Sequence, residues 1–318
     1  MELRWDPILE EWIIVSGARR DRPLTPEGFC PFCPGADEIP AHGWKVLSLP
    51  NKFPALQANP PAPDVKGDQF YRCRPAEGVC EVVLYTPQHD GSLGSLSVEH
   101  IGLVIGLWTE RYRELGDRNH IKYVLIFENK GRETGTTLDH PHAQIYAFPF
   151  VPPVIRRELS SSKRYWDRNR ACLFCSVIKK EKSEALRLVS ENRSFVCFLP
   201  FFARWPYGVH IYPKRHVQAL TDLTEKERQG LAQILKQVLT KFDNLFNSGF
   251  PYMMVLHQRP NETKPYPHYH FHVEFYPPYR EKGKIKSFAS VETGAGTVTF
   301  DYRPESKAEE LRRSPEIR

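Results

Sequence analysis

The fold is decided by residues 123–146, YVLIFENKGRETGTTLDHPHAQIY, because a stretch of the same plan returns at residues 252–274, YMMVLHQRPNETKPYPHYHFHVE. Each stretch begins with a run of apolar and aromatic residues, which predicts a β-strand. Each then passes through a polar loop and ends in a cluster of alternating histidines. Successive side chains of a strand point to opposite faces, so the histidines of one cluster should share a face. Two such stretches in one chain indicate an internal repeat.

The repeat extends towards the N-terminus of each half. A Cys-x-x-Cys pair comes first, at Cys30–Cys33 and again at Cys172–Cys175, and a β-type run, a histidine and a helix follow in each half. The helices should begin near Ser97 and Thr224, and 43 and 44 residues separate these starts from the first histidine of each cluster. The order of parts is therefore the same twice.

This organisation predicts an α+β fold, a tandem of two domains that each have a mostly antiparallel sheet and packed helices. The length of 318 residues also exceeds that of a usual single core. We place the N-terminal domain at residues 1–163 and the C-terminal domain at residues 164–318, since the polar stretch 160–164 lies at the join.

The composition narrows the class of protein. A hydrophobic content of 41% and a charged content of 26% are typical of a soluble globular chain. The net charge of +6 suits an acidic substrate such as a phosphate ester, but does not by itself indicate nucleic acid. The N-terminus lacks the apolar core of a secretion signal, and no apolar run is long enough to cross a bilayer. We expect a cytoplasmic protein that binds neither membrane nor nucleic acid and keeps its seven cysteines reduced.

Paired thiolates on one tight turn, with histidines that follow, are typical of tetrahedral zinc sites. The first expected site is Cys2His2 and consists of Cys30, Cys33, His89 and His140. The second has the same composition and consists of Cys172, Cys175, His216 and His268. A single pair could equally be a redox dithiol or two buried cysteines, but two pairs in matching positions favour metal. A rival to the second site, suited to iron or zinc, comprises Glu158, His257 and His272, with Glu274 as a further candidate.

The first histidine cluster also carries candidate catalytic residues. His140, His142 and Gln144 alternate, so they should share one face of a strand. A neutral imidazole is a nucleophile towards phosphorus, and a carbonyl that accepts from one ring nitrogen would leave the other for attack. An amide such as that of Gln144 can stabilise charge on a phosphoryl oxygen. His140, bound to a structural zinc, would anchor the strand.

At this point the sequence resembles a known family. His-Pro-His-Ala-Gln at residues 140–144 is similar to the signature of the transferase branch of the histidine-triad superfamily. The resemblance to the galactose-1-phosphate uridylyltransferase family covers nearly the whole chain. It includes residues 5–16, 19–23, 127–131, 205–207, 213–216 and 275–278.

The resemblance implies a ping-pong reaction. UDP-glucose would donate UMP to His142 and release glucose 1-phosphate, and galactose 1-phosphate would take the UMP to give UDP-galactose. Gln144 would steady the phosphoryl group, and the hydroxyl of Thr137 would stand where many members have serine. Nucleotide and phosphate contacts are implied for Arg22, Asn51, Phe53 and Asn129. The resemblance also implies that Lys286, Val291 and Glu292 belong to a segment that contacts the sugar. In a homodimer, each subunit would supply this segment to the site of its partner.

The sequence leaves alternatives for the substrate and for the reaction. Val298 lies where a sugar-binding glutamine is expected, and plant relatives with two Cys2His2 patterns act on ADP-glucose, so both the sugar and the base are undecided. A phosphorylase or hydrolase of the same superfamily, or a zinc protein that binds nucleotide without catalysis, are the other readings. His270 is expected to occupy the nucleophile position of the second repeat without being active.

Overall fold

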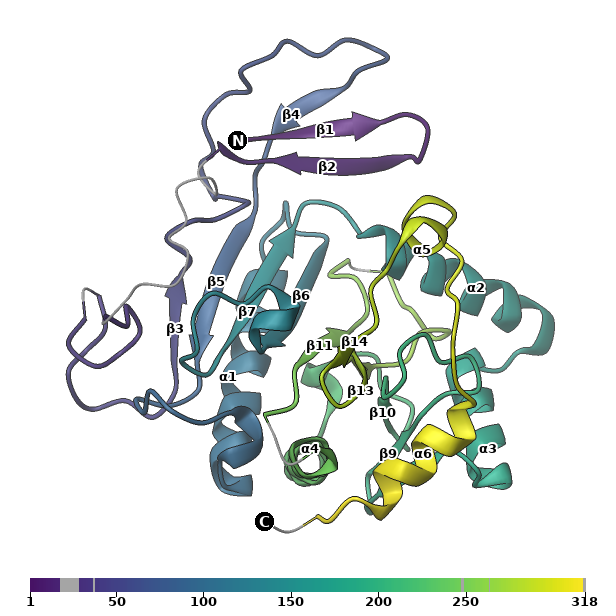
Figure 1. The fold of residues 1–318 in the computed structure, drawn as a ribbon. Coiled ribbons are helices and arrows are strands. Elements are labelled where there is room, and N and C mark those ends of the chain that lie inside the picture. Colours follow the sequence, from purple (N-terminus) through teal and green to yellow (C-terminus); the bar gives the residue numbers. More distant parts are fainter. Residues whose placement is uncertain (18–28, 37, 247–248, 263, 317–318) are drawn as a thin grey trace.

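A single nine-stranded sheet forms the centre of the molecule (Figure 1). The computed structural model describes residues 1–17, 29–36, 38–246, 249–262 and 264–316. All neighbouring strands of the sheet pair antiparallel. In spatial order they are β3 (Leu47–Pro50), β5 (Val79–Leu84), β7 (His142–Phe148), β6 (Tyr123–Lys130), β11 (Tyr252–His257), β12 (His272–Tyr276), β10 (His210–Pro213), β9 (Phe195–Phe198) and β8 (Leu188–Glu191).

Two long helices pack against one another on one face of this sheet. These are α1 (Val98–Gly116) and α4 (Glu225–Leu245). Ser97 caps the first helix by accepting from the backbone N–H of His100, and Thr224 caps the second by accepting from that of Glu227. Both predicted helix starts are confirmed. Side chains of both helices and of the central strands form the main hydrophobic core.

The opposite face is covered differently in the two halves. Over the C-terminal half lie α2 (Pro153–Asn169) and α3 (Leu173–Glu184), in contact with β12 through Phe174, whose ring lies 5.2 Å from that of His272. Over the N-terminal half a small three-stranded sheet projects from the body, and it consists of β1 (Glu2–Asp6), β2 (Glu11–Val15) and β4 (Cys73–Pro75) (Figure 1).

The chain ends in short elements. A two-stranded ribbon of β13 (Tyr279–Glu281) and β14 (Lys284–Ile285) leads to α5 (Ser290–Gly294). The last helix, α6 (Pro304–Arg313), buries Ala308 and Leu311 in the main core. Among the described residues, no helix is both long enough and apolar enough to span a bilayer.

The strand registers define which residues of the two halves are equivalent. Phe127 of β6 pairs with Val255 of β11, and these two residues pair in turn with Gln144 and Glu274. When β7 and β12 are matched at their first residues, His142 and His272, these registers relate the two halves by an approximate twofold axis that passes between Phe127 and Val255. Counting along the strands from this axis gives the other equivalent positions. Asn129 corresponds to His257, His142 to His272, and Gln144 to Glu274.

The α+β class and the mostly antiparallel pairing are confirmed, but the sheets of the two halves are joined. The β6–β11 pairing makes them one continuous sheet, so neither half has a separate one. The polar stretch 160–164 lies within α2 and is not a linker. The domain boundary at residues 163 and 164 stays a prediction.

Candidate active site and metal centres

His142 opens β7 and lies at the wall of a cavity of about 220 Å³. Its Nδ1 lies 2.7 Å from the carbonyl oxygen of His140. A carbonyl only accepts, so Nδ1 carries the proton and the lone pair of the neutral ring lies on Nε2. The ring of Phe32 packs edge-on at 5.2 Å and fixes the orientation of the imidazole. This is the geometry that a histidine nucleophile requires.

Strand ends and loops from both halves surround this cavity. Of the predicted substrate contacts, Asn129 lines it together with His142. The other lining residues are Gly91, Ser92, Glu128, Lys130, Gly131, Thr136, Leu138, Asp139, His140, Pro141, Gly249 and Phe250. Thr137 is adjacent to lining residues in the loop between β6 and β7, and Gln144 lies two residues along β7, on the same face as His142.

The remaining predicted substrate contacts are not brought to the cavity within one chain. Asn51 lies beyond the end of β3, where its side-chain oxygen accepts from the backbone N–H of Phe53. Lys286, Val291 and Glu292 lie in the C-terminal segment, and none of them lines the cavity. A further predicted contact, Arg22, lies outside the described residues.

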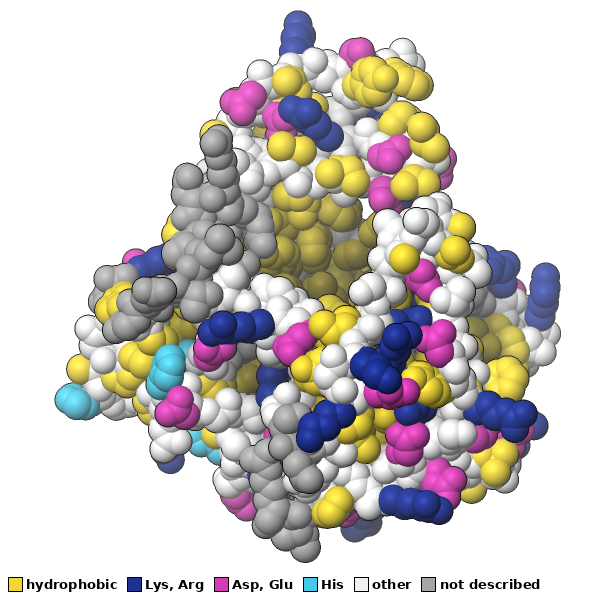
Figure 2. All heavy atoms as spheres, viewed as in Figure 1, with side chains coloured by type: hydrophobic (Ala, Val, Ile, Leu, Met, Phe, Trp, Pro, Cys, Tyr) yellow, Lys and Arg dark blue, Asp and Glu magenta, His cyan; other side chains and the backbone are white. Residues whose placement is uncertain are grey.

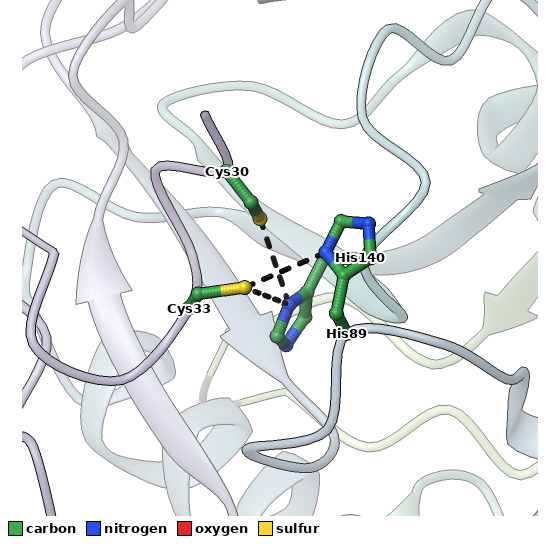
Figure 3. Close-up of side chains that lie close together, drawn as sticks. All are labelled: Cys30, Cys33, His89 and His140. Carbon is green, nitrogen blue, oxygen red and sulfur yellow. Dashed lines mark hydrogen bonds between the residues drawn. The ribbon is translucent and has the colours of Figure 1, made fainter. Parts of the chain in front are cut away.

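The four predicted ligands of the first metal site converge (Figure 3). Nδ1 of His140 lies 3.7 Å from Sγ of Cys30 and 3.9 Å from Sγ of Cys33, and Nδ1 of His89 lies 3.5 Å from Sγ of Cys33. His140 donates from Nε2 to the carbonyl oxygen of Thr86 at 2.8 Å, so its Nδ1 lone pair faces the sulfurs. Burial and the neighbouring Cys30 raise the pKa of the Cys33 thiol. Converging lone pairs of this kind fit a soft divalent cation.

The second cysteine site has the predicted form but a different second histidine. Nδ1 of His216 and Nδ1 of His270 each lie 3.4 Å from Sγ of Cys175. Cys172 completes the group of four. His270 donates from Nε2 to the carbonyl oxygen of Pro213 at 3.0 Å, as His140 does to Thr86.

The prediction that His268 belongs to this site is wrong. Its side chain is not among the four converging groups, and its backbone carbonyl oxygen lies 3.7 Å from Sγ of Cys172. The reason is the register of β12: because this strand begins at His272, His270 is the counterpart of His140. The prediction aligned the first histidines of the two clusters, His140 and His268. This alignment is two residues out of register, and two residues are one repeat of a strand. For the same reason His272, and not His270, is the counterpart of His142.

The cluster predicted as a rival also forms, and it exists beside the cysteine site. It joins Glu158 of α2 to His257, His272 and Glu274 of β11 and β12. His257 Nδ1 lies 2.9 Å from Glu158, and His272 Nε2 lies 3.2 Å from Glu274. Although burial opposes the charge, the carboxylates of Glu158 and Glu274 raise the pKa of His257 to about 9.

His272 has the tautomer of His142. Its Nδ1 donates to the carbonyl oxygen of His270 at 2.9 Å, so the lone pair of the neutral ring lies on Nε2. In the N-terminal half the ring borders a cavity, whereas here Nε2 faces carboxylate oxygens of Glu274 and Glu158. Acceptor atoms that converge in this way fit a cation. The second repeat therefore carries a candidate metal centre at the place where the first carries its candidate nucleophile.

Sequence reasoning missed several residues of the cavity, among them the two charged neighbours of Asn129. Glu128 and Lys130 flank Asn129 and line the same space. The available signal was the alternation of Val124, Ile126 and Glu128, which puts a carboxylate on an otherwise apolar strand face.

Comparison with known proteins agrees with this arrangement. The sequence model of the galactose-1-phosphate uridyl transferase N-terminal domain matches residues 2–152, and that of the C-terminal domain matches residues 158–316. A galactose-1-phosphate uridylyltransferase of Thermotoga maritima is 41% identical over 314 residues, which cover 98% of each chain.

Solved structures extend the similarity to three dimensions. A structure described as a uridylyltransferase has a TM-score of 0.91 at 42% identity, and the match covers 99% of this chain and 98% of that one. An ADP-glucose phosphorylase of Arabidopsis thaliana, solved with bound ADP-glucose, has a TM-score of 0.76 at 25% identity, with 98% of each chain covered. The chain belongs to the galactose-1-phosphate uridylyltransferase family.

Proposed function

We propose that the protein transfers UMP from UDP-glucose to galactose 1-phosphate through a covalent intermediate on His142. In the first step Nε2 attacks the α-phosphorus, the bond to the β-phosphate oxygen breaks, and glucose 1-phosphate leaves. In the second step a phosphate oxygen of galactose 1-phosphate attacks the same phosphorus, the P–N bond breaks, and UDP-galactose leaves. The observation that carries this proposal is the Nδ1 hydrogen bond of His142, which puts the ring lone pair on Nε2 at the cavity.

The residues around His142 would stabilise the charge that develops on the phosphoryl group. Gln144 shares the strand face of His142, and Asn129 lines the cavity, and we expect both amides to donate to non-bridging oxygens. Thr137 would add a hydroxyl from the adjoining loop. We assign Asn51, Phe53 and Arg22 to the nucleotide by family resemblance.

We infer that both cysteine sites hold zinc and that the carboxylate and histidine cluster holds iron or zinc. Two sulfurs and two imidazoles match the preference of zinc, and four protein ligands leave no open position for a substrate. A metal bound at the first site would supply rigidity, because His140 is at once a ligand and the residue whose carbonyl orients His142. Oxygen and nitrogen donors at the third site suit either iron or zinc. Cysteines that serve as ligands agree with a reducing compartment, and we place the protein in the cytoplasm.

We also propose a homodimer in which the partner subunit completes the site. Lys286, Val291 and Glu292 are absent from the lining of the cavity of their own chain, and the side chain of Val291 is 48% exposed. The face shown in Figure 2 has apolar side chains on the projecting sheet above a recess with apolar walls. Ile8 and Leu9, in the turn between β1 and β2, are 88% and 65% exposed. Apolar patches of this kind are typical of interaction surfaces.

The proposal is tested by partial exchange. A ping-pong enzyme exchanges labelled glucose 1-phosphate into UDP-glucose without any galactose 1-phosphate, whereas a sequential enzyme requires both substrates. We expect exchange with UDP-glucose and much slower exchange with ADP-glucose. Exchange with ADP-glucose alone would keep the mechanism and change the base, and the absence of exchange with either nucleotide sugar would contradict the covalent mechanism.

A further inference from the structure

A buried carboxylate lies at the cavity wall and is not used by the reaction steps above. Glu128 of β6 is 4% exposed and lines the cavity together with His142. The hydroxyl of Tyr85 donates to Oε2 of Glu128 and the hydroxyl of Tyr252 donates to Oε1, each at 2.9 Å. Both tyrosines are fully buried. Burial of a carboxylate is unfavourable, and two neutral donors compensate for it only in part.

The fold does not require this arrangement. Through the approximate twofold axis, Glu128 corresponds to Leu256, and Tyr252 corresponds to Val124. Leu256 and Val124 are both buried in the main core. The strand position of Glu128 is thus filled by an apolar side chain, Leu256, in the half that carries no nucleophile, and the position of Tyr252 is filled by Val124 in the other half. A polar group at a position that packs well with leucine indicates a functional reason for the carboxylate.

A short path connects this carboxylate to His142. The backbone N–H of Tyr85 donates to the carbonyl oxygen of Pro141, the residue directly before the nucleophile, at 3.2 Å. The carbonyl oxygen of Tyr85 in turn accepts from Nε2 of His100 at 2.7 Å. Tyr85 is therefore held at three points, and its hydroxyl bond to Glu128 is the one that can change with ionisation.

We propose, on the basis of the proposed uridylyl transfer, that ionised Glu128 is a positioning residue, which acts through Tyr85 to hold the 140–142 segment so that His142 attacks in line. The ionised carboxylate accepts from both tyrosines at once. The protonated form is uncharged and therefore a weaker acceptor, so its bonds to the two tyrosine hydroxyls lose strength.

Ionisation of this group falls in the working pH range. Burial raises the pKa of Glu128 to about 7, although the hydroxyls of Tyr85 and Tyr252 and the charge of Lys130 lower it. The charged and titratable groups that face it are these two tyrosines, Lys130 of its own strand and Asp243 of α4. Lys130 and Asp243 are paired with each other at 2.7 Å. Loss of alignment at a reacting centre reduces rates by about ten- to a hundredfold.

The test compares wild-type protein with Glu128→Gln from pH 6 to pH 8.5. We expect the ratio of wild-type to variant kcat to rise with pH through about 7 and then level at about ten or more, with KM changed less. The titration of His142 is common to both proteins and cancels in the ratio. A kcat ratio above one that does not change with pH would contradict the role of ionisation and leave Glu128 a structural residue. A kcat ratio of one at every pH would show that Glu128 has no role in the reaction.

Two further variants separate positioning from folding. Glu128→Leu installs the side chain of the equivalent position, so we expect an unchanged or higher midpoint of thermal unfolding together with a low kcat. Tyr85→Phe and Tyr252→Phe each remove one donor to Glu128, but only Tyr85 is bonded to Pro141, so the first should lower kcat more. Equal losses that follow the unfolding midpoints would overturn the inference. Wild-type protein without exchange activity would instead contradict the proposed function, and the inference with it.

Discussion

At the scale of single residues, the same imidazole geometry has two different surroundings. His142 and His272 both donate from Nδ1 to the carbonyl oxygen two residues earlier. What distinguishes them is their surroundings: His142 lines a cavity, whereas Nε2 of His272 faces two carboxylates. The local backbone fixes the tautomer, whereas neighbours from other elements decide the role.

This contrast predicts different outcomes for matched substitutions. His142→Asn should lower transfer by roughly a thousandfold or more, because no other group at the cavity replaces the nucleophile. His272→Asn should keep the nucleophile and instead lower the metal content and the midpoint of thermal unfolding. Partial-exchange rates and metal analysis of both purified variants check this. Equal loss of exchange, at equal metal content, would contradict the assignment.

Glu128 predicts a pH dependence of stability. Its pKa is about 7 in the folded protein against an ordinary value of 4.5, so the folded state binds more protons between these values. Its contribution to the free energy of unfolding therefore falls as pH rises from about 4.5 to 7, by about 1.4 kcal/mol per pKa unit. Relative to Glu128→Leu, wild-type protein should lose thermal stability between pH 5 and pH 8. Parallel profiles of the two proteins would contradict the raised pKa.

At the scale of elements, the sequence predicted what depends on local pattern. Ser97 and Thr224 begin helices because their side chains cap the backbone, and that signal is written in the residues themselves. The Cys30–Cys33 pair likewise marks a turn, whereas the Cys172–Cys175 pair lies in the first turn of α3. The register of β12 could not be predicted from local sequence pattern. Three histidines at alternate positions offer two registers on the same face, and only pairing with β11 selects His270 as the ligand.

The corrected register predicts which histidine retains metal. His270→Ala should lose about one equivalent of zinc per chain, since a tetrahedral site with three remaining ligands binds more weakly. His268→Ala is the matched control, because its side chain lies outside the cluster, and it should keep the full metal content. Metal analysis by mass spectrometry after dialysis measures both. Zinc loss from the His268 variant alone would restore the original prediction.

At the scale of the whole molecule, pairing of β6 with β11 could not be predicted either. Each half has a complete apolar pattern of its own, so the sequence alone is equally compatible with two separate sheets. The joining of the sheets brings Gly249 and Phe250 of the second half to the cavity of the first. It also leaves Lys286 and Glu292 away from that cavity.

A dimer with shared sites predicts complementation. His142→Asn and Lys286→Ala should each be nearly inactive as homodimers. If one subunit supplies Lys286 to the nucleophile of its partner, a mixed dimer has one intact site, and mixing the unfolded and refolded variants should restore part of the activity. If both residues served the same chain, no site of the mixed dimer would be intact. The absence of recovery, with mixed dimers demonstrated by mass, would contradict the shared site.

In the proposed mechanism one of two equivalent histidines, His142, carries the nucleotide. The most direct measurement mixes the protein with UDP-glucose in the absence of galactose 1-phosphate and maps the adduct by peptide mass spectrometry under basic conditions. We predict one added UMP per chain, on the peptide that contains His142, and none on the peptide that contains His272. UMP on the His272 peptide, or a metal-loaded folded protein that forms no adduct, would contradict the account.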